Sequence, residues 1–112
     1  MPQQTTITPQ QNVFTLVNVF TVAPDQQQKL VDALIQTTDT VVRPLPGFIS
    51  ASIHQSSDGT RVVNYGQWED QAAFERMMAH PDFQARLQLA TQLGQPDGHF
   101  YTVVATLTAH DE

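Results

Sequence analysis

The chain has 112 residues, enough for one small domain, and its formal charge is −6 because 11 Asp and Glu outnumber five Lys and Arg. So few cations provide no basic surface for binding DNA or RNA. No apolar run approaches the roughly 18 residues of a membrane span, and no secretory signal is visible, so we expect a cytoplasmic protein. The absence of cysteine excludes disulfides, thiolate metal sites and cysteine nucleophiles.

The first half of the chain predicts an arm, a strand and a helix. Residues 1–11 are rich in Gln, Thr and Pro and predict a disordered arm. Residues 12–22 are rich in Val, Phe and Thr, which is typical of a strand, and both faces of this strand are largely apolar. A helix is expected from Pro24, with apolar residues near helical spacing at Leu30, Val31, Leu34, Ile35, Val41 and Val42. The Thr-rich residues 37–40 weaken its last turns, and Pro44 and Pro46 end it.

The second half predicts a hairpin, two helices and a last strand. Strands at residues 47–56 and 61–69 flank the turn residues Asp58-Gly59. Asp70 caps a helix that turns Phe74, Met77 and Met78 inward, and Pro81 starts another helix with Phe83 and Leu87 inward. Gly94 and Pro96 end that helix, residues 99–108 form the final strand, and residues 109–112 are a tail.

This order of elements, β-α-β-β-α-β, predicts a ferredoxin-like α+β fold over residues 12–108, with helices on one face of a four-stranded antiparallel sheet. The other face also carries apolar side chains, among them Val63 and Tyr65. A second copy stacked sheet on sheet would bury this face, so we expect a homodimer.

Two asparagines interrupt strands that are otherwise apolar. Asn64 shares one face of its strand with Gly66 and Trp68, and Gly66 leaves a gap that a flat ligand or a helix could fill. Asn18 lies on the first strand, which the topology places beside the third, so both amides are expected to face the space between sheet and helices. A few fixed polar groups in an apolar pocket are typical of a small-molecule site. The alternative stays open: each amide is satisfied by backbone groups, and Trp68 is a core residue.

Other residues that could carry chemistry are few. His54, near the end of the second strand, is a candidate proton acceptor. Arg86 on the last helix could form a surface ion pair or reach an anionic ligand. The four histidines have no metal-ligand spacing, so we expect no metal site, and no nucleotide-binding or acyl-transfer motif occurs.

The segment VVNYGQWE at residues 62–69, followed by Ala73-Phe74 and by the residues HPDF at 80–83, resembles the antibiotic biosynthesis monooxygenase family. The residues Pro-Gly-Phe at 46–48 and Asp-Gly at 58–59 extend the resemblance over nearly the whole of residues 12–108. This family has the ferredoxin-like fold and forms dimers with facing sheets, called dimeric α+β barrels. The resemblance therefore implies the same fold and the same homodimer as the strand pattern.

The resemblance is greatest to small monooxygenases of aromatic polyketide pathways, which oxidise phenolic polycycles to quinones with O₂ and need no flavin, haem or metal. It implies catalytic roles for Asn64, Trp68 and His54. A tyrosine of that subgroup falls at Phe74, so its hydroxyl is absent here, and the subgroup's helix arginine falls close to Arg86.

The haem-degrading branch of the same family has an Asn on its first strand, a Trp that ends its third strand and an axial His on its second helix. Asn18 and Trp68 match this pattern, but Leu87 stands where the His is needed. The missing ligand disfavours haem binding.

The leading hypothesis is a cofactor-independent monooxygenase that acts on a phenolic or hydroquinone substrate. Asn64 would hold the substrate oxygen and stabilise its negative charge, Trp68 would stack on the ring, and His54 would accept the proton. The substrate pocket would further comprise Asn18, Gly66, Phe74, Met77, Met78, Phe83, Arg86 and Leu87.

Two alternatives remain: a non-catalytic dimeric domain that binds a small aromatic or has a structural role, and a haem-degrading or quinol monooxygenase relative. An open cavity beside Asn64 and Trp68 would favour the enzyme. Side chains filling that space would favour the non-catalytic domain.

Overall fold

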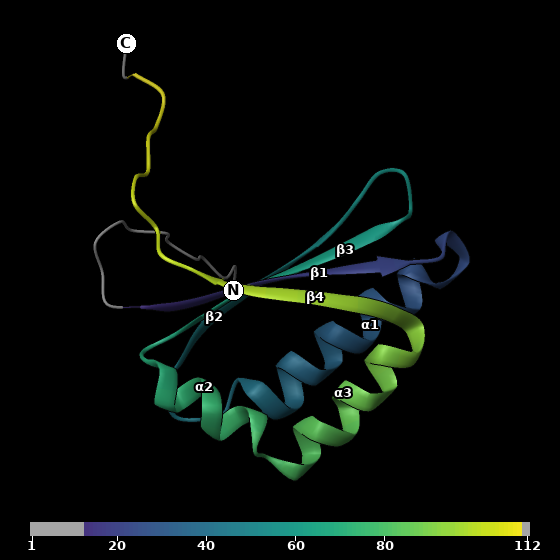
Figure 1. The fold of residues 1–112 in the computed structure, drawn as a ribbon, viewed down its shortest axis with the longest axis horizontal. Helices are drawn as coiled ribbons and strands as arrows, with labels where there is room; N and C mark the ends of the chain where they lie inside the picture. Colours follow the sequence, from purple (N-terminus) through teal and green to yellow (C-terminus); the bar gives the residue numbers. More distant parts are fainter. Residues whose placement is uncertain (1–12, 111–112) are drawn as a thin grey trace.

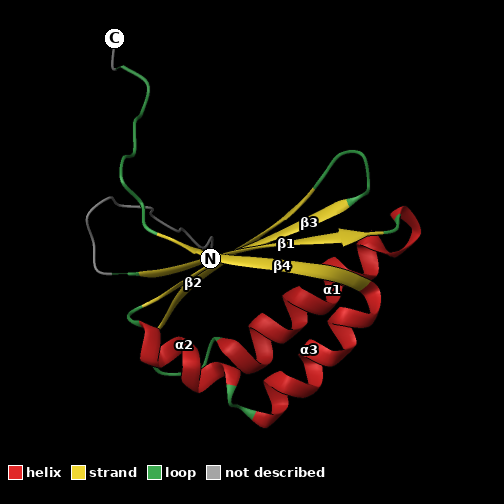
Figure 2. Ribbon diagram, viewed as in Figure 1, coloured by secondary structure: helices red, strands yellow, loops and turns green. Residues whose placement is uncertain are grey.

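A computed structural model describes residues 13–110 of the chain. Four strands form one antiparallel sheet in the order β2-β3-β1-β4, and the helices cover one of its faces (Figures 1 and 2). The strands are β1 (Phe14–Val22), β2 (Phe48–Gln55), β3 (Arg61–Trp68) and β4 (Gly94–Tyr101). The α-helices are α1 (Gln27–Thr37), α2 (Gln71–Met78) and α3 (Pro81–Leu93). The predicted ferredoxin-like architecture is confirmed.

Two groups of buried apolar side chains hold the helices on the sheet. One lies under α1 and α3 and comprises Phe20, Val22, Leu30, Val31, Leu34, Val62 and Ala90. The other lies under α2 and comprises Val42, Trp68, Ala73, Phe74 and Met77. Among the helices of residues 13–110, none is long and apolar enough to cross a membrane.

The predicted weakness at the end of the first long helix appears as a change of helix type. A 3₁₀ turn at Pro24–Gln26 leads into α1, and α1 continues into a π-helical turn at Thr38–Val42. In that turn the backbone N–H of Arg43 donates to the carbonyl of Thr38, five residues earlier, at 2.9 Å. β-Branched threonine is a poor helix former, and the Thr40 hydroxyl donates to the Gln36 carbonyl at 2.8 Å, so these residues loosen the regular helix.

The last strand is shifted from its predicted position at residues 99–108. It begins at Gly94, directly after α3, and ends at Tyr101. Pro96 is tolerated because β4 is an edge strand. A Cβ on Gly94 would lie 3.0 Å from Leu30 Cδ2 and 3.1 Å from the Thr21 carbonyl oxygen, so glycine permits a close approach here. Gly94 and Pro96 therefore do more than end the helix: they begin the strand.

The residues after β4 have no regular secondary structure and lead away from the body of the domain (Figure 1). Two apolar side chains in this segment, Val104 and Leu107, are 83% and 90% exposed. The predicted arm at residues 1–11 and the last two residues of the tail lie outside the described residues.

Candidate functional site

A cavity of about 290 Å³ lies between the helix-covered face of the sheet and the helices. Asn18, Asn64, Gly66 and Trp68 belong to its sheet wall. The helical wall includes the other predicted pocket residues: Phe74, Met77, Met78, Phe83, Arg86 and Leu87. The space beside Asn64 and Trp68 is thus open, which favours a binding site over a filled core.

The two asparagines face each other across neighbouring strands. Asn18 of β1 and Asn64 of β3 are directly paired in the antiparallel register, and both line the cavity. Side chains at such paired positions have Cβ atoms about 5 Å apart. The prediction that the two carboxamides share one space is therefore confirmed.

Asn18 is held in place by β4. Its Oδ1 accepts a hydrogen bond from the backbone N–H of Asp97 at 3.1 Å. A Cβ on Gly98, the strand partner of Asn18, would lie 3.3 Å from Asn18 Cγ, so the glycine leaves room for this amide. Because its oxygen is engaged with β4, the group that Asn18 offers to a ligand is its Nδ2 donor.

Asn64 has a buried polar atom without a partner. Its Oδ1 is inaccessible to solvent and accepts no hydrogen bond from any described residue. A buried polar group left unsatisfied costs about 1–3 kcal/mol, so such an atom calls for an explanation. The residue lines the cavity, so a ligand hydroxyl would supply the missing donor once the side chain rotates to expose Oδ1.

Trp68 closes one end of the cavity. It is 3% exposed, and its ring packs edge-on against Phe48 and Phe74, with centroid distances of 5.1 and 6.2 Å. A Cβ on Gly66 would lie 3.9 Å from Trp68 Nε1. The absent side chain at Gly66 therefore leaves the Nε1 edge of the indole uncovered on the side of Asn64.

Arg86 is the only charged side chain among the described residues that line the cavity. It is half-buried on α3, between the apolar residues Phe83 and Leu87 of the same helix. A single cation in an apolar cavity favours ligands that carry or develop negative charge.

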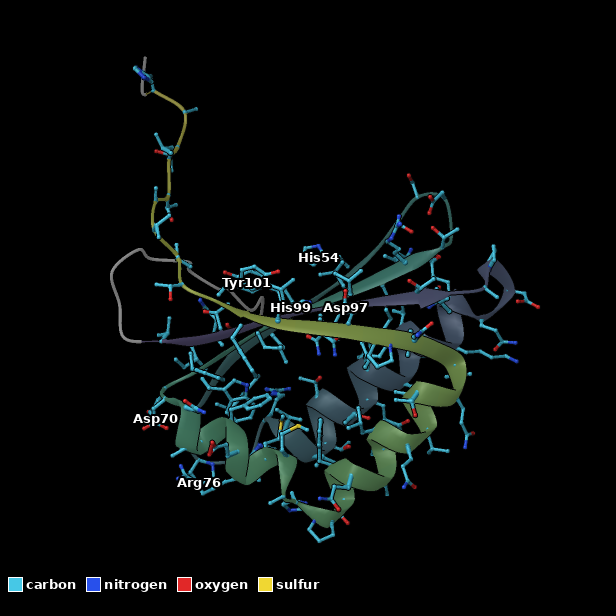
Figure 3. All side chains as sticks on the ribbon, in the orientation of Figure 1. His54, Asp70, Arg76, Asp97, His99 and Tyr101 are labelled. Carbon is cyan, nitrogen blue, oxygen red and sulfur yellow. The ribbon has the colours of Figure 1, made fainter. Side chains whose placement is uncertain are left out.

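His54 lies elsewhere, and its predicted place at the site needs correction. It pairs with Val63, whereas the neighbouring Ile53 pairs with Asn64, so His54 points to the opposite face of the sheet. Figure 3 shows its ring on the side of the sheet away from the helices. The same face carries His99, which contacts Asp97 at 2.9 Å. His54 lies on a strand, as predicted, but the alternation of side chains along β2 turns it away from the cavity.

The sequence analysis missed several cavity residues on α1 and the π-helical turn, namely Thr37, Thr38 and Val42. The cluster of threonines at residues 37–40 is the available signal, but local rules read from the sequence indicate only a weak helix end there. Within residues 13–110, no group of three or more His, Asp or Glu side chains could hold a metal ion.

Comparison with known proteins links this geometry to one enzyme family. The model of the family described as antibiotic biosynthesis monooxygenase matches residues 13–88. A curated relative, tetracenomycin-F1 monooxygenase of Streptomyces glaucescens, is 43% identical over 104 residues, which is 93% of each chain.

Solved structures give the same result. The monooxygenase ActVA-Orf6 of Streptomyces coelicolor, in complex with nanaomycin D, is 34% identical, with a TM-score of 0.75 over 87% of this chain and 92% of that one. SnoaB, a cofactor-independent oxygenase from Streptomyces nogalater, is 28% identical, with a TM-score of 0.73 over 88% of this chain and 99% of that one.

Proposed function

This chain belongs to the antibiotic biosynthesis monooxygenase family, and we propose that it oxidises a phenolic polycyclic substrate to a quinone with O₂, without a cofactor. The observation that carries the proposal is the unpartnered Oδ1 of Asn64 beside an open, largely apolar cavity. The cavity would hold a flat aromatic ring system, and the amide would bind its reacting oxygen.

The relatives support this choice of reaction. One is named a tetracenomycin-F1 monooxygenase, one is described as a cofactor-independent oxygenase, and one is a monooxygenase solved with nanaomycin D bound. Their identities to this chain, between 28% and 43% over most of each protein, support the same class of small aromatic substrate.

The proposed reaction balances without an added reductant. A phenol that carries a ring C–H para to its hydroxyl reacts with O₂ to give a para-quinone and water. One oxygen atom becomes the new carbonyl, the other leaves as water, and the substrate supplies all the electrons. The protein has to bind the phenol, favour its ionised form and exclude bulk water around the ring.

The residues of the cavity suit these tasks. Once its side chain rotates towards the ligand, Asn64 accepts the phenol O–H at Oδ1 in the ground state, and its Nδ2 can donate to the phenolate. The Arg86 guanidinium and the Asn18 Nδ2 add positive potential, which lowers the pKa of a bound phenol. Trp68 and Phe74 supply flat apolar surface for the ring. No carboxylate or histidine lines the cavity among the described residues, so the phenol's proton passes to water.

The test is conversion of a hydroxylated anthrone by purified, EDTA-treated protein under ¹⁸O₂. We expect a quinone that carries one ¹⁸O atom, and no conversion without oxygen. Asn64→Ala should lower kcat/KM by about 10²-fold, the usual effect of removing one stabilising group from a developing anion. Gln92→Ala, exposed on α3, is the matched control and should leave the rate unchanged.

Three results would reject the proposal: equal conversion without oxygen, dependence on an added flavin or metal, and an unchanged rate in Asn64→Ala. Trp68→Phe should cost less than Asn64→Ala, because the phenyl ring keeps part of the apolar surface.

We also propose that the chain forms a homodimer through the uncovered face of the sheet. That face carries the apolar Val17, Val19 and Val63 beside Tyr65, and no helix of residues 13–110 covers it. Val104 and Leu107, exposed in the segment after β4, add apolar surface that a second copy could cover. Burial of these side chains against a second copy would stabilise a domain of this size.

A further inference from the structure

We propose that Thr37 and Thr38 form a second polar subsite, which binds a hydroxyl or carbonyl oxygen of the substrate remote from its reacting ring. This inference rests on the proposed function, because it concerns the same cavity. It assigns a specificity role to the helical wall, whereas the proposed chemistry takes place at the sheet wall.

Thr37 is a buried polar residue whose hydroxyl is not used by the fold. Its side chain is 9% exposed and lines the cavity, and its hydroxyl has no hydrogen-bond partner among residues 13–110. Other helical threonines behave differently: the hydroxyls of Thr40 and Thr91 donate to the carbonyls of Gln36 and Gln88, each at 2.8 Å. The Thr37 hydroxyl therefore keeps both its donor and its acceptor capacity for a ligand.

Helical spacing explains why two successive residues can reach one cavity. Thr37 and Thr38 lie three and four positions after Leu34, which also lines the cavity, and residues at these spacings share one helix face. Here α1 changes to the π-turn at Thr38, and Thr37, Thr38 and Val42 all line the cavity. Thr38 also lines a shallower outer groove beside Asp39 and Ala51, so it lies at the rim, while Thr37 lies deeper.

The two polar walls face each other across apolar surface. Asn18 and Asn64 lie on the sheet wall, and the threonines lie on α1 and the π-turn, with Phe20 and Leu34 among the residues that line the same space. A purely apolar ligand would leave the threonine hydroxyls without partners. A polycyclic phenol with a second oxygen substituent on a distant ring would satisfy both walls, which defines the substrate class.

The experiment compares the binding of two ligands without oxygen. One is an anthrone with hydroxyls on both outer rings, and the other lacks the remote hydroxyl. Trp68 is the only tryptophan of the chain and forms part of the cavity wall, so quenching of its fluorescence reports binding directly. A neutral hydrogen bond contributes about 1 kcal/mol, so wild type should prefer the dihydroxylated ligand by about fivefold.

Substitutions on the helix show which hydroxyl causes the preference for the dihydroxylated ligand. Thr37→Val keeps the shape but removes the hydroxyl and should bind both ligands equally, whereas Thr37→Ser should retain the preference. Thr38→Val, at the rim, should lose part of it. Thr40→Val is the matched control, because this threonine lies in the same turn but is exposed and donates to Gln36. Circular dichroism verifies that each variant is folded.

Three results would each overturn the subsite. Wild type could show no preference for the dihydroxylated ligand. Thr37→Val could keep the preference, or it could bind both ligands more weakly by the same factor. Because binding is measured without O₂, a failure of turnover counts against the proposed function alone. If Thr37→Val does not fold, Thr38→Val provides the test. A Thr38→Val variant that keeps the full wild-type preference for the dihydroxylated ligand then overturns the proposal.

Discussion

Asn64 is the residue at which folding and function make opposite demands. Its buried Oδ1 has no partner in the described part of the chain and so costs stability. We predict that Asn64→Leu raises the thermal midpoint by a few degrees while anthrone oxidation is lost, because the unsatisfied atom is removed together with the binding group. Thermal unfolding followed by circular dichroism, together with the oxidation assay, checks this. A fall in the midpoint would favour the alternative in which the amide is structural.

His54 provides a second prediction at this scale. Because it lies on the sheet face opposite the cavity, His54→Ala should leave kcat/KM within about twofold of wild type. The pH profile of kcat/KM should follow the ionisation of the substrate phenol and should shift when a phenol of different pKa is used. A profile that keeps one inflection near neutral pH with every substrate, and loses it in His54→Ala, would contradict this prediction.

Asp58 makes the hairpin turn sensitive to acid. Hydrogen bonds from the Thr60 hydroxyl at 2.7 Å and the Ser56 hydroxyl at 2.8 Å lower the pKa of its carboxyl from 3.8 to about 2. A lowered pKa means that the ionised form stabilises the fold; this contribution is complete above pH 3.8 and is lost as the pH falls towards 2.

The stability of Asp58→Ala relative to wild type measures this contribution. The difference in urea midpoint should be constant from pH 7 to pH 5 and should shrink as the pH falls below 4. A difference that stays constant down to pH 2 would show that the carboxylate charge does not act in the turn.

At the scale of elements, α2 depends on one capping side chain. Asp70 accepts a hydrogen bond from the backbone N–H of Ala73 at 2.8 Å, and α2 contributes Phe74 and Met77 to the cavity wall. Asp70→Ala should cost about 1 kcal/mol of unfolding free energy in urea denaturation, whereas Asp70→Asn should restore most of it, since asparagine caps equally well. Equal losses in both variants would indicate that the charge of Asp70, and not its capping geometry, stabilises the helix.

Local sequence signals predict where some elements begin but not where others do. The start of α1 at a proline turn, the cap of α2, the start of α3 at Pro81 and the Asp58-Gly59 turn were all predictable, because each depends on residues close in sequence. Gly59 has φ +81°, as the turn requires. The start of β4 was not predictable in this way. Gly94 and Pro96 break a helix by local rules, and only pairing with Val22 and Phe20 of the distant β1 makes a strand of them.

At the scale of the molecule, the proposed homodimer is the property most easily measured. Light scattering after gel filtration should give twice the 12.5 kDa chain mass. Val63→Lys places a charge in the middle of the uncovered sheet face and should shift the protein towards monomer, whereas Gln92→Ala should not. A wild-type mass of 12.5 kDa at micromolar concentration would contradict the dimer.

The sequence by itself determined the order of elements, the ferredoxin-like fold, the family and the asparagine and tryptophan residues of the cavity, because these follow from side-chain periodicity, turn chemistry and a recognisable motif. Tertiary structure alone decided which residues meet. The register of β1 against β3 brings Asn18 to Asn64, the alternation along β2 turns His54 away from them, and the buried face of α1 brings Thr37 into the same space. The physical reason is the two-residue repeat of a strand: a shift of one position moves a side chain to the other face, and only pairing with distant strands sets that position.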